Sequence, residues 1–128
     1  MIFGIGTDIV SHARICTLWE KYGDRLAERI LHPHELPAYQ ASKQPSHLLA
    51  KRFAAKEAFV KACGTGIRPP MTLRAIGVDH DALGKPLFLL DLAAQEWLEQ
   101  QGAGRIHLSI TDEREFACAF VVIEAKGN

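Results

Sequence analysis

The sequence predicts one compact α+β domain over residues 1–128, in which an antiparallel sheet packs with one long helix and several shorter helices. A chain of 128 residues that is 48% hydrophobic and 23% charged suits a single globular core. Residues 47–63 have the composition of a strong helix. Residues 107–110 and 116–124 are strand-like runs that a polar turn separates, which favours a terminal antiparallel hairpin.

The first predicted strand covers residues 2–10, and its two faces differ. One face carries mainly apolar side chains, whereas the other is nearly bare around one carboxylate, because it consists of Gly4, Gly6 and Asp8. Glycine and aspartate are both disfavoured inside strands. Asp8 is therefore either a turn residue at the end of the strand or a functional carboxylate.

Helices are expected to follow the first strand. Ser11 can cap a helix over residues 13–22, and a second helix over residues 24–31 should end before Pro33. The long helix is expected over residues 47–63, with Ser46 as its N-cap.

The second half of the chain should form a hairpin, a helix and another hairpin. The predicted segments are strands over 75–79 and 87–89 joined by a turn over 81–86, a helix over 91–101, and strands over 107–110 and 116–124.

Charge and cysteine usage limit the class of protein. Fifteen basic and fifteen acidic residues cancel, so the whole molecule lacks the field that attracts nucleic acid. The three cysteines are odd in number and lack the spacing of a zinc site or a disulfide framework, which favours a reducing compartment. With no secretion signal and no apolar run of about 20 residues, we expect a cytoplasmic protein without a membrane or nucleic-acid partner.

Glu57 is the unusual residue of the long helix. At 100° per residue it lies about 40° from Phe53 and about 60° from Val60, at the edge of the apolar stripe. Lys61 follows one turn later, so the two residues form either an ordinary helix ion pair or part of a site. Asp8 and Glu57 together offer two oxygen ligands to a hard cation such as Mg²⁺, and Lys61 offers charge for a phosphate.

Four blocks of sequence resemble the holo-acyl-carrier-protein synthase family of 4'-phosphopantetheinyl transferases over almost the whole chain. They are residues 4–10 with Arg14-Ile15, residues 52–62 followed by Gly64-Thr65-Gly66, residues 84–86, and residues 107–112 running into 117–124. Many members of the family carry histidine where this chain has Asp112, so position 112 receives no catalytic role.

The resemblance implies a Mg²⁺-dependent enzyme that transfers 4'-phosphopantetheine from coenzyme A to a serine of apo acyl carrier protein and releases adenosine 3',5'-bisphosphate. It implies that Asp8 and Glu57 bind the metal and act in catalysis together with Lys61. It also implies a homotrimer with active sites between subunits. The residues expected at the coenzyme are Arg52, Lys61, Gly64, Thr65, Gly66, Pro86, Ser109 and Thr111.

The glycine-rich segment Gly64-Thr65-Gly66 has two interpretations. Its backbone amides can approach the coenzyme phosphates, or the segment can simply cap the C-terminus of the long helix. Pro86, Ser109 and Thr111 are expected to wall the nucleotide pocket, although turn and core roles are equally open.

A basic stripe is predicted on the early helices, where Arg14, Lys21, Arg25 and Arg29 lie within about 80° if the two helices are continuous. Acidic residues lie beside this stripe, so it is either a self-paired surface or a docking site. The resemblance favours docking of the acidic carrier protein.

Two other functions share the same residues. A Mg²⁺-dependent nucleotide pyrophosphohydrolase also needs clustered carboxylates but uses water as the nucleophile. In a non-catalytic oligomeric binding module, Asp8 and Glu57 would be structural.

Overall fold

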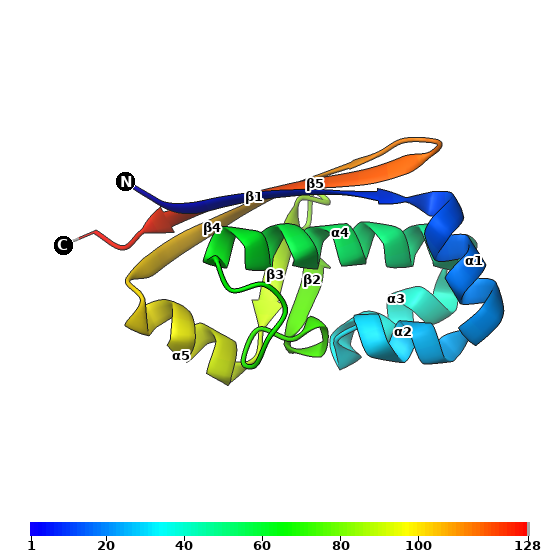
Figure 1. The fold of residues 1–128 in the computed structure, drawn as a ribbon, viewed down its shortest axis with the longest axis horizontal. Helices are drawn as coiled ribbons and strands as arrows, with labels where there is room; N and C mark the ends of the chain where they lie inside the picture. Colours follow the sequence, from blue (N-terminus) through cyan, green and yellow to red (C-terminus); the bar gives the residue numbers. More distant parts are fainter. Residues whose placement is uncertain (128) are drawn as a thin grey trace.

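The computed structural model describes residues 1–127, and Figure 1 shows its helices and strands. The strands are β1 (Ile2–Ser11), β2 (Ile76–His80), β3 (Pro86–Leu90), β4 (Ala103–Asp112) and β5 (Phe116–Ala125). The α-helices are α1 (His12–Tyr22), α2 (Asp24–Ile30), α3 (Leu36–Ala41), α4 (Pro45–Cys63) and α5 (Leu92–Gln100), and the 3-10 helices are η1 (Pro33–Glu35) and η2 (Leu73–Ala75).

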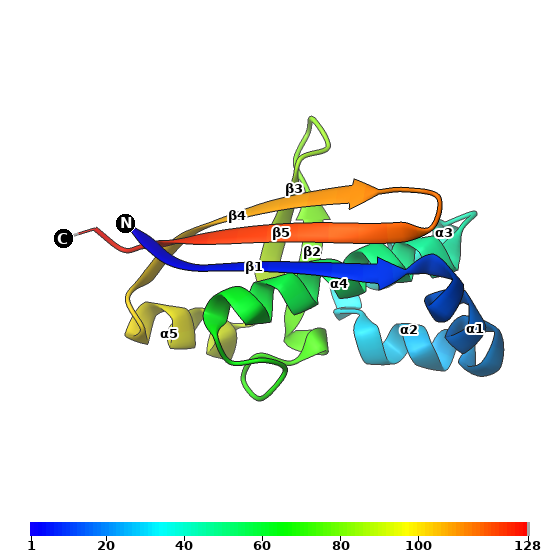
Figure 2. The ribbon, with the colours of Figure 1, turned by 45° about the horizontal axis from the view of Figure 1, so that its top comes forward.

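The strands form two antiparallel sheets rather than one. β1, β5 and β4 form a three-stranded sheet in that order, and β2 pairs with β3 in a separate hairpin. The long helix α4 lies along one face of the larger sheet, with α1 and α2 at one end of the molecule and α5 at the other (Figures 1 and 2). The α+β class, the long helix and both predicted hairpins are confirmed.

The two glycines of β1 are explained by packing. A Cβ atom on Gly4 would lie 1.9 Å from the backbone oxygen of Ala62, and one on Gly6 would lie 1.9 Å from that of Ala58. Only residues without side chains allow the strand to approach the helix backbone so closely. The bare face of β1 therefore packs on α4 and brings Asp8 to the side of this helix.

The opposite face of the larger sheet is open. Ile5 and Ile9 of β1 are 61% and 63% exposed, and Phe116 and Phe120 of β5 are 43% and 46% exposed. The register places Ile9 opposite Cys118 and Ser11 opposite Phe116, so these apolar side chains belong to one surface. An apolar sheet face of this kind is typical of an interaction surface.

Several predicted boundaries were wrong. The helix α4 begins at Pro45, which occupies its first turn, so Ser46 lies inside the helix and the N-cap is Gln44. The helix α3 was not predicted, and Pro37 lies in its first turn, where proline is tolerated. The N-cap role of Ser11 is confirmed by a 3.2 Å hydrogen bond from the backbone N–H of Arg14 to its Oγ.

Candidate active site

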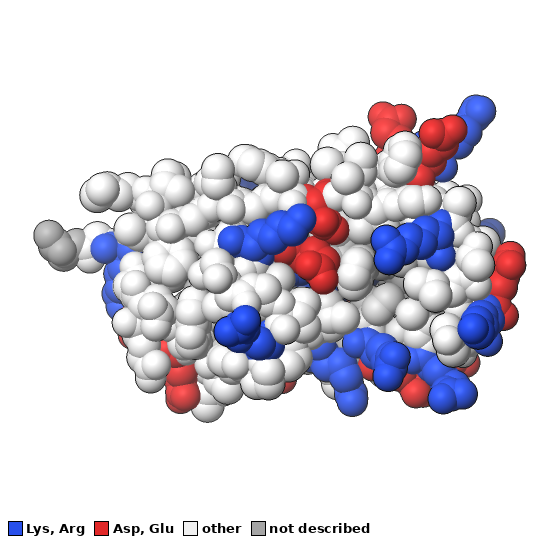
Figure 3. Space-filling model, in the orientation of Figure 1, with Lys and Arg blue, Asp and Glu red and all other residues white. Residues whose placement is uncertain are grey.

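Asp8, Glu57 and Lys61 lie together where β1 crosses α4. The Nζ atom of Lys61 donates hydrogen bonds of 3.0 Å to the Oδ1 atom of Asp8 and 3.0 Å to the backbone oxygen of Thr7. The Asp8 side chain is only 17% exposed. Acidic side chains gather in the middle of this face of the molecule beside basic ones (Figure 3). Among the described residues Lys61 pairs with Asp8 and not with Glu57, so the simple helix ion pair does not describe this cluster.

The electrostatics of the cluster favour a bound cation. Partial burial raises the pKa of Glu57 above its ordinary value, the negative charge of Asp8 raises it further, and Lys61 opposes the shift. Two carboxylates compete here for one ammonium group, which leaves an excess of negative charge. Mg²⁺ commonly takes one or two carboxylates from a protein and completes its coordination with phosphate and water oxygens, so the residues present fit this ion.

The glycine-rich segment after α4 caps the helix. Gly64 has a φ angle of 80°, which favours glycine, and its N–H group donates to the backbone oxygen of Lys61. The N–H groups of Thr65 and Gly66 both donate to the backbone oxygen of Val60, at 3.2 and 3.3 Å. All three amides donate to backbone oxygens at the helix end, so the segment caps the helix, and its contact with the coenzyme phosphates stays a prediction.

A pocket lies on the other flank of α4 from the Asp8 cluster, beside β4 and the β2–β3 hairpin. We call it the second pocket. Its volume is about 250 Å³, and it contains Arg52 and Pro86 from the predicted coenzyme residues. The Nη1 atom of Arg52 also donates a 2.9 Å hydrogen bond to the backbone oxygen of Val78, and burial lowers the pKa of this guanidinium. Arg52 therefore holds α4 to β2 as well as lining the pocket.

Ser109 and Thr111 face away from this pocket. They are exposed and alternate along β4 with Ile110, which does line the pocket. Their side chains consequently lie on the open face of the larger sheet, with Ile9 and Phe120. Within one copy of the chain they do not join Arg52 and Pro86.

The predicted site residues thus form two groups separated by α4. Glu57 lies about 140° around the helix from Arg52 and about 180° from Leu48, another residue of the second pocket. β1, which carries Asp8, and β4, which borders the pocket, are the two outer strands of the sheet. The central strand β5 therefore lies between Asp8 and the pocket. A single copy carries two half-sites that do not face each other.

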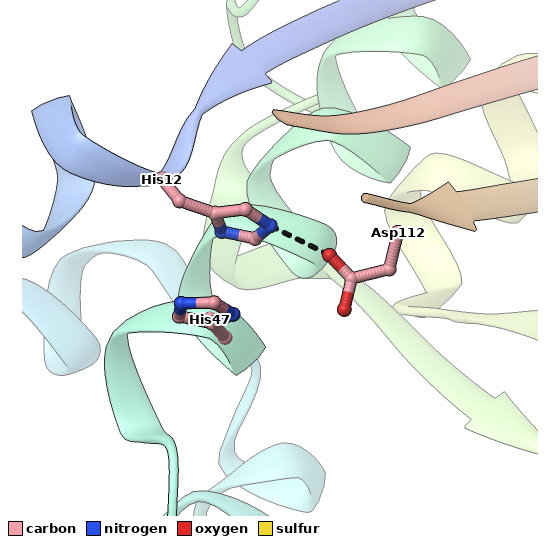
Figure 4. Close-up of side chains that lie close together, drawn as sticks. All are labelled: His12, His47 and Asp112. Atoms are coloured by element: carbon pink, nitrogen blue, oxygen red, sulfur yellow. Dashed lines mark hydrogen bonds and ion pairs between the residues drawn. The ribbon is translucent and has the colours of Figure 1, made fainter. Parts of the chain in front are cut away.

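Asp112 belongs to the second pocket and contacts a histidine that sequence reasoning did not consider (Figure 4). The Oδ1 atom of Asp112 lies 2.6 Å from the Nε2 atom of His12, which is only 4% exposed. The ring of His47 stacks on that of His12, with centroids 3.9 Å apart and planes 10° apart. No local pattern predicts this contact, because His12 and Asp112 are 100 residues apart.

The stacking decides between two interpretations of this cluster. Imidazole nitrogens bind metals along lone pairs that lie in the ring plane. In two nearly parallel rings these lone pairs run side by side and do not converge on one ion. His12, His47 and Asp112 are therefore best described as an imidazole–carboxylate pair with a stacked neighbour, which fastens the start of α1 to the end of β4.

A large groove of about 1230 Å³ runs between the two early helices and the segment around η2. Its basic residues are Arg25 and Arg29 of α2 and Arg74 of η2, and its apolar lining includes Leu18 and Leu26. Arg74 was not predicted, because it is 45 positions beyond Arg29 in the sequence. The groove thus combines three arginines and one glutamate, Glu28, with apolar side chains, so its charge is net positive.

The predicted basic stripe is divided. Gly23 has a φ angle of 57° and separates α1 from α2, so the two helices are not continuous. Arg25 and Arg29 line the groove, whereas Arg14 and Lys21 are exposed on α1 and are not among its lining residues. Lys21 instead lies over the ring of Tyr22, 5.2 Å from its centroid.

Comparison with known proteins identifies close relatives. Residues 4–121 match the sequence model of the family described as the 4'-phosphopantetheinyl transferase superfamily. The holo-[acyl-carrier-protein] synthase of Nitrosospira multiformis is 55% identical over 124 residues, which cover 97% of this chain and 99% of the relative.

Solved structures show the same similarity. The crystal structure of holo-[acyl-carrier-protein] synthase from Neisseria meningitidis has a TM-score of 0.93 and 55% identity, covering 97% of this chain and 99% of that chain. The corresponding structure from Bacillus anthracis, in complex with CoA (3',5'-ADP), has a TM-score of 0.82 and 37% identity, covering 98% of this chain and 99% of that chain.

Proposed function

The chain belongs to the 4'-phosphopantetheinyl transferase superfamily, and from that premise we propose how its side chains carry out the reaction. The chain is an enzyme that transfers the 4'-phosphopantetheine group from coenzyme A to apo acyl carrier protein. The observation that supports our assignment of the reacting centre is the convergence of Asp8, Glu57 and Lys61 from β1 and α4.

We propose that Asp8 and Glu57 hold Mg²⁺, which when bound neutralises charge on the pyrophosphate of coenzyme A. Lys61 is released from Asp8 to contact a phosphate oxygen. The carrier serine oxygen forms a bond to the pantetheine-side phosphorus, the bond from this phosphorus to the bridging oxygen breaks, and adenosine 3',5'-bisphosphate leaves with that oxygen. Glu57 would accept the serine proton.

The enzyme is proposed to work as a homotrimer in which neighbouring copies complete each active site. Two observations support this. The half-site of Asp8 and Glu57 and the pocket of Arg52 lie on opposite flanks of α4, so one copy cannot enclose a long substrate between them. The exposed Ile5, Ile9 and Phe120 give the sheet an apolar face that a second copy would cover.

Mixing two inactive variants tests the shared site. Asp8→Ala removes one half-site, and Lys51→Glu reverses a charge in the other, where Lys51 lines the pocket. Co-assembly of equal amounts of the two variants should restore about a quarter of the wild-type sites, because one interface in each mixed trimer joins two intact halves. Each variant alone is the control, and mixed assemblies as inactive as both controls would contradict a shared site.

The carrier protein is proposed to dock in the groove of Arg25, Arg29 and Arg74. The arginines match the charge of an acidic helix, and the apolar side chains that line the groove can pack against the apolar face of that helix. Arg14 and Lys21 would contact the carrier outside the groove. Their exposure on α1 is compatible with this role.

Arg25→Glu should raise the KM for the carrier about tenfold or more at low salt, and the effect should shrink as salt is added. The KM for coenzyme A should stay unchanged, since Arg25 lines the groove and belongs to neither half-site. Steady-state kinetics at two ionic strengths measure both constants, and Lys43→Glu, at an exposed position between α3 and α4, is a charge-matched control. An equal rise in both KM values would indicate a general defect instead of lost docking.

Mass spectrometry of the carrier tests the reaction itself. Incubation with coenzyme A, Mg²⁺ and apo carrier should increase the carrier mass by one phosphopantetheine group. Cleavage of coenzyme A with an unmodified carrier would support a pyrophosphohydrolase, and the absence of any Mg²⁺-dependent turnover would support a binding module.

We also place the enzyme in the cytoplasm, because Cys16, Cys63 and Cys118 are all free thiols, which suits a reducing compartment. In the part of the chain that the structure describes, no helix combines the length and hydrophobicity that a membrane crossing requires.

A further inference from the structure

Lys56 is a fully buried lysine next to the catalytic Glu57 on α4. Its side chain has no exposed surface, and its ammonium group makes three hydrogen bonds. The acceptors are the backbone oxygen of Ile30 at 2.6 Å, the Oε1 atom of Glu35 at 2.5 Å and the backbone oxygen of Leu73 at 3.1 Å. All three N–H donors of the ammonium are therefore satisfied.

Two of these acceptors belong to α2 and η2, the neighbouring segments that line the carrier groove. Ile30 is the last residue of α2, whose Arg25 and Arg29 line one wall. Leu73 is the first residue of η2, and it lines the other wall together with Arg74. The Lys56 ammonium thus joins the two walls, because it donates to a backbone oxygen of each segment.

The third acceptor makes the ammonium tolerable in the interior. The Glu35 side chain is also fully buried, and its Oε2 atom lies 3.7 Å from the Nε atom of Arg52. Burial lowers the pKa of Lys56 to about 8, although the charge of Glu35 opposes this shift. Replacing a buried ion pair by well-packed neutral side chains of similar volume often leaves a protein equally stable. Stability alone therefore does not require the ion pair of Lys56 and Glu35.

We propose that Lys56 is a positioning residue that sets the separation of the two walls of the carrier groove through its bonds to the backbone oxygens of Ile30 and Leu73. Because Lys56 and Glu57 are adjacent on α4, the same residue fixes the groove relative to the metal-binding carboxylate. This inference rests on the proposed docking of the carrier in the groove.

Three variants separate the tie between the walls from the buried ion pair. Lys56→Met alone leaves Glu35 buried without its partner and is expected to unfold easily. The double variant Lys56→Met/Glu35→Gln removes both charges at nearly constant volume and should recover stability, while Ile30 and Leu73 still lack a shared donor. Glu35→Gln alone also removes a partner of the buried ion pair and should lower stability, but the Lys56 amine keeps enough N–H donors for Ile30 and Leu73, charged or neutral, so the tie is kept.

Steady-state transfer kinetics of the full enzyme should then distinguish the variants. The double variant is expected to raise the KM for the carrier by about tenfold to a hundredfold, because a small misplacement of a docked substrate has effects of this size. Its KM for coenzyme A should remain at the wild-type value. Glu35→Gln should keep the wild-type KM for the carrier. Lys126→Met/Glu99→Gln makes the same chemical changes in an exposed ion pair and is the matched control.

The outcomes are distinct. A carrier KM that stays at the wild-type value in the double variant, that rises together with the KM for coenzyme A, or that rises equally in Glu35→Gln would overturn the role of Lys56. Failure of the wild-type enzyme to modify the carrier in the same assay would instead overturn the proposed function.

Discussion

Asp8→Asn and Glu57→Gln are each expected to reduce transfer of phosphopantetheine at least about a hundredfold to a thousandfold. Each change keeps the size of the side chain and removes one negative charge, so the fold should persist while the pair of carboxylates no longer holds Mg²⁺ beside the pyrophosphate. The initial rate of carrier modification, followed by mass spectrometry at saturating coenzyme A, measures the loss. Glu96→Gln, an exposed glutamate on α5, is the matched control.

The dependence on Mg²⁺ makes this prediction specific. Either variant should need a much higher Mg²⁺ concentration for its remaining activity, whereas Glu96→Gln should follow the wild-type curve. Unfolding temperatures of the variants close to that of the wild type would show that the effect is local. Full activity in Asp8→Asn or Glu57→Gln at wild-type Mg²⁺ concentration would remove the basis of the proposed mechanism.

Gly6→Ala is expected to destabilise the protein by at least about 3 kcal/mol, at the upper end of the range for overpacked cores. The new Cβ atom would lie 1.9 Å from the backbone oxygen of Ala58 and 2.7 Å from the backbone nitrogen of Ala62, and a backbone cannot yield as a flexible side chain does. β1 would have to separate from α4. Asp8 would move with the strand, so activity should fall as well.

Urea denaturation measures this effect as a fall in the transition midpoint. Gly127→Ala is the control, because a Cβ atom at position 127 meets nothing within 4 Å. A midpoint within experimental error of the wild type for Gly6→Ala would contradict the close packing of β1 on α4.

Local patterns were reliable where neighbours in the sequence are also neighbours in space. Glu57 and Lys61 are one helical turn apart, and the terminal hairpin joins β4 to β5 through a short turn, so periodicity and turn residues predicted both. The same patterns failed at α3 and at Ser46, because a proline within a helical first turn looks in the sequence like an interruption.

The coenzyme residues show a different limit. Ser109 and Thr111 were grouped with Pro86 by the resemblance, yet in one copy their side chains emerge on the other face of the sheet, since strand neighbours alternate. The sequence does not give the hydrogen-bond partners of the Gly64, Thr65 and Gly66 amides. In the structure these amides donate to backbone oxygens at the end of the helix. Sequence order specifies neither the direction of a side chain nor the partner of an amide.

The sequence by itself determined the fold class and the family, and it singled out Asp8 and Glu57 as candidate metal ligands, because these inferences depend on residue types at short, fixed spacings. Only the tertiary structure decided that Asp8 and Lys61 are paired, that Lys56 bonds to the backbone oxygens of Ile30 and Leu73, and that the predicted coenzyme residues fall on two flanks of α4. These contacts join residues from 17 to 53 positions apart. The packing of β1, α2 and η2 around α4 brings such residues together, and the spacing of residues along the chain does not contain that information.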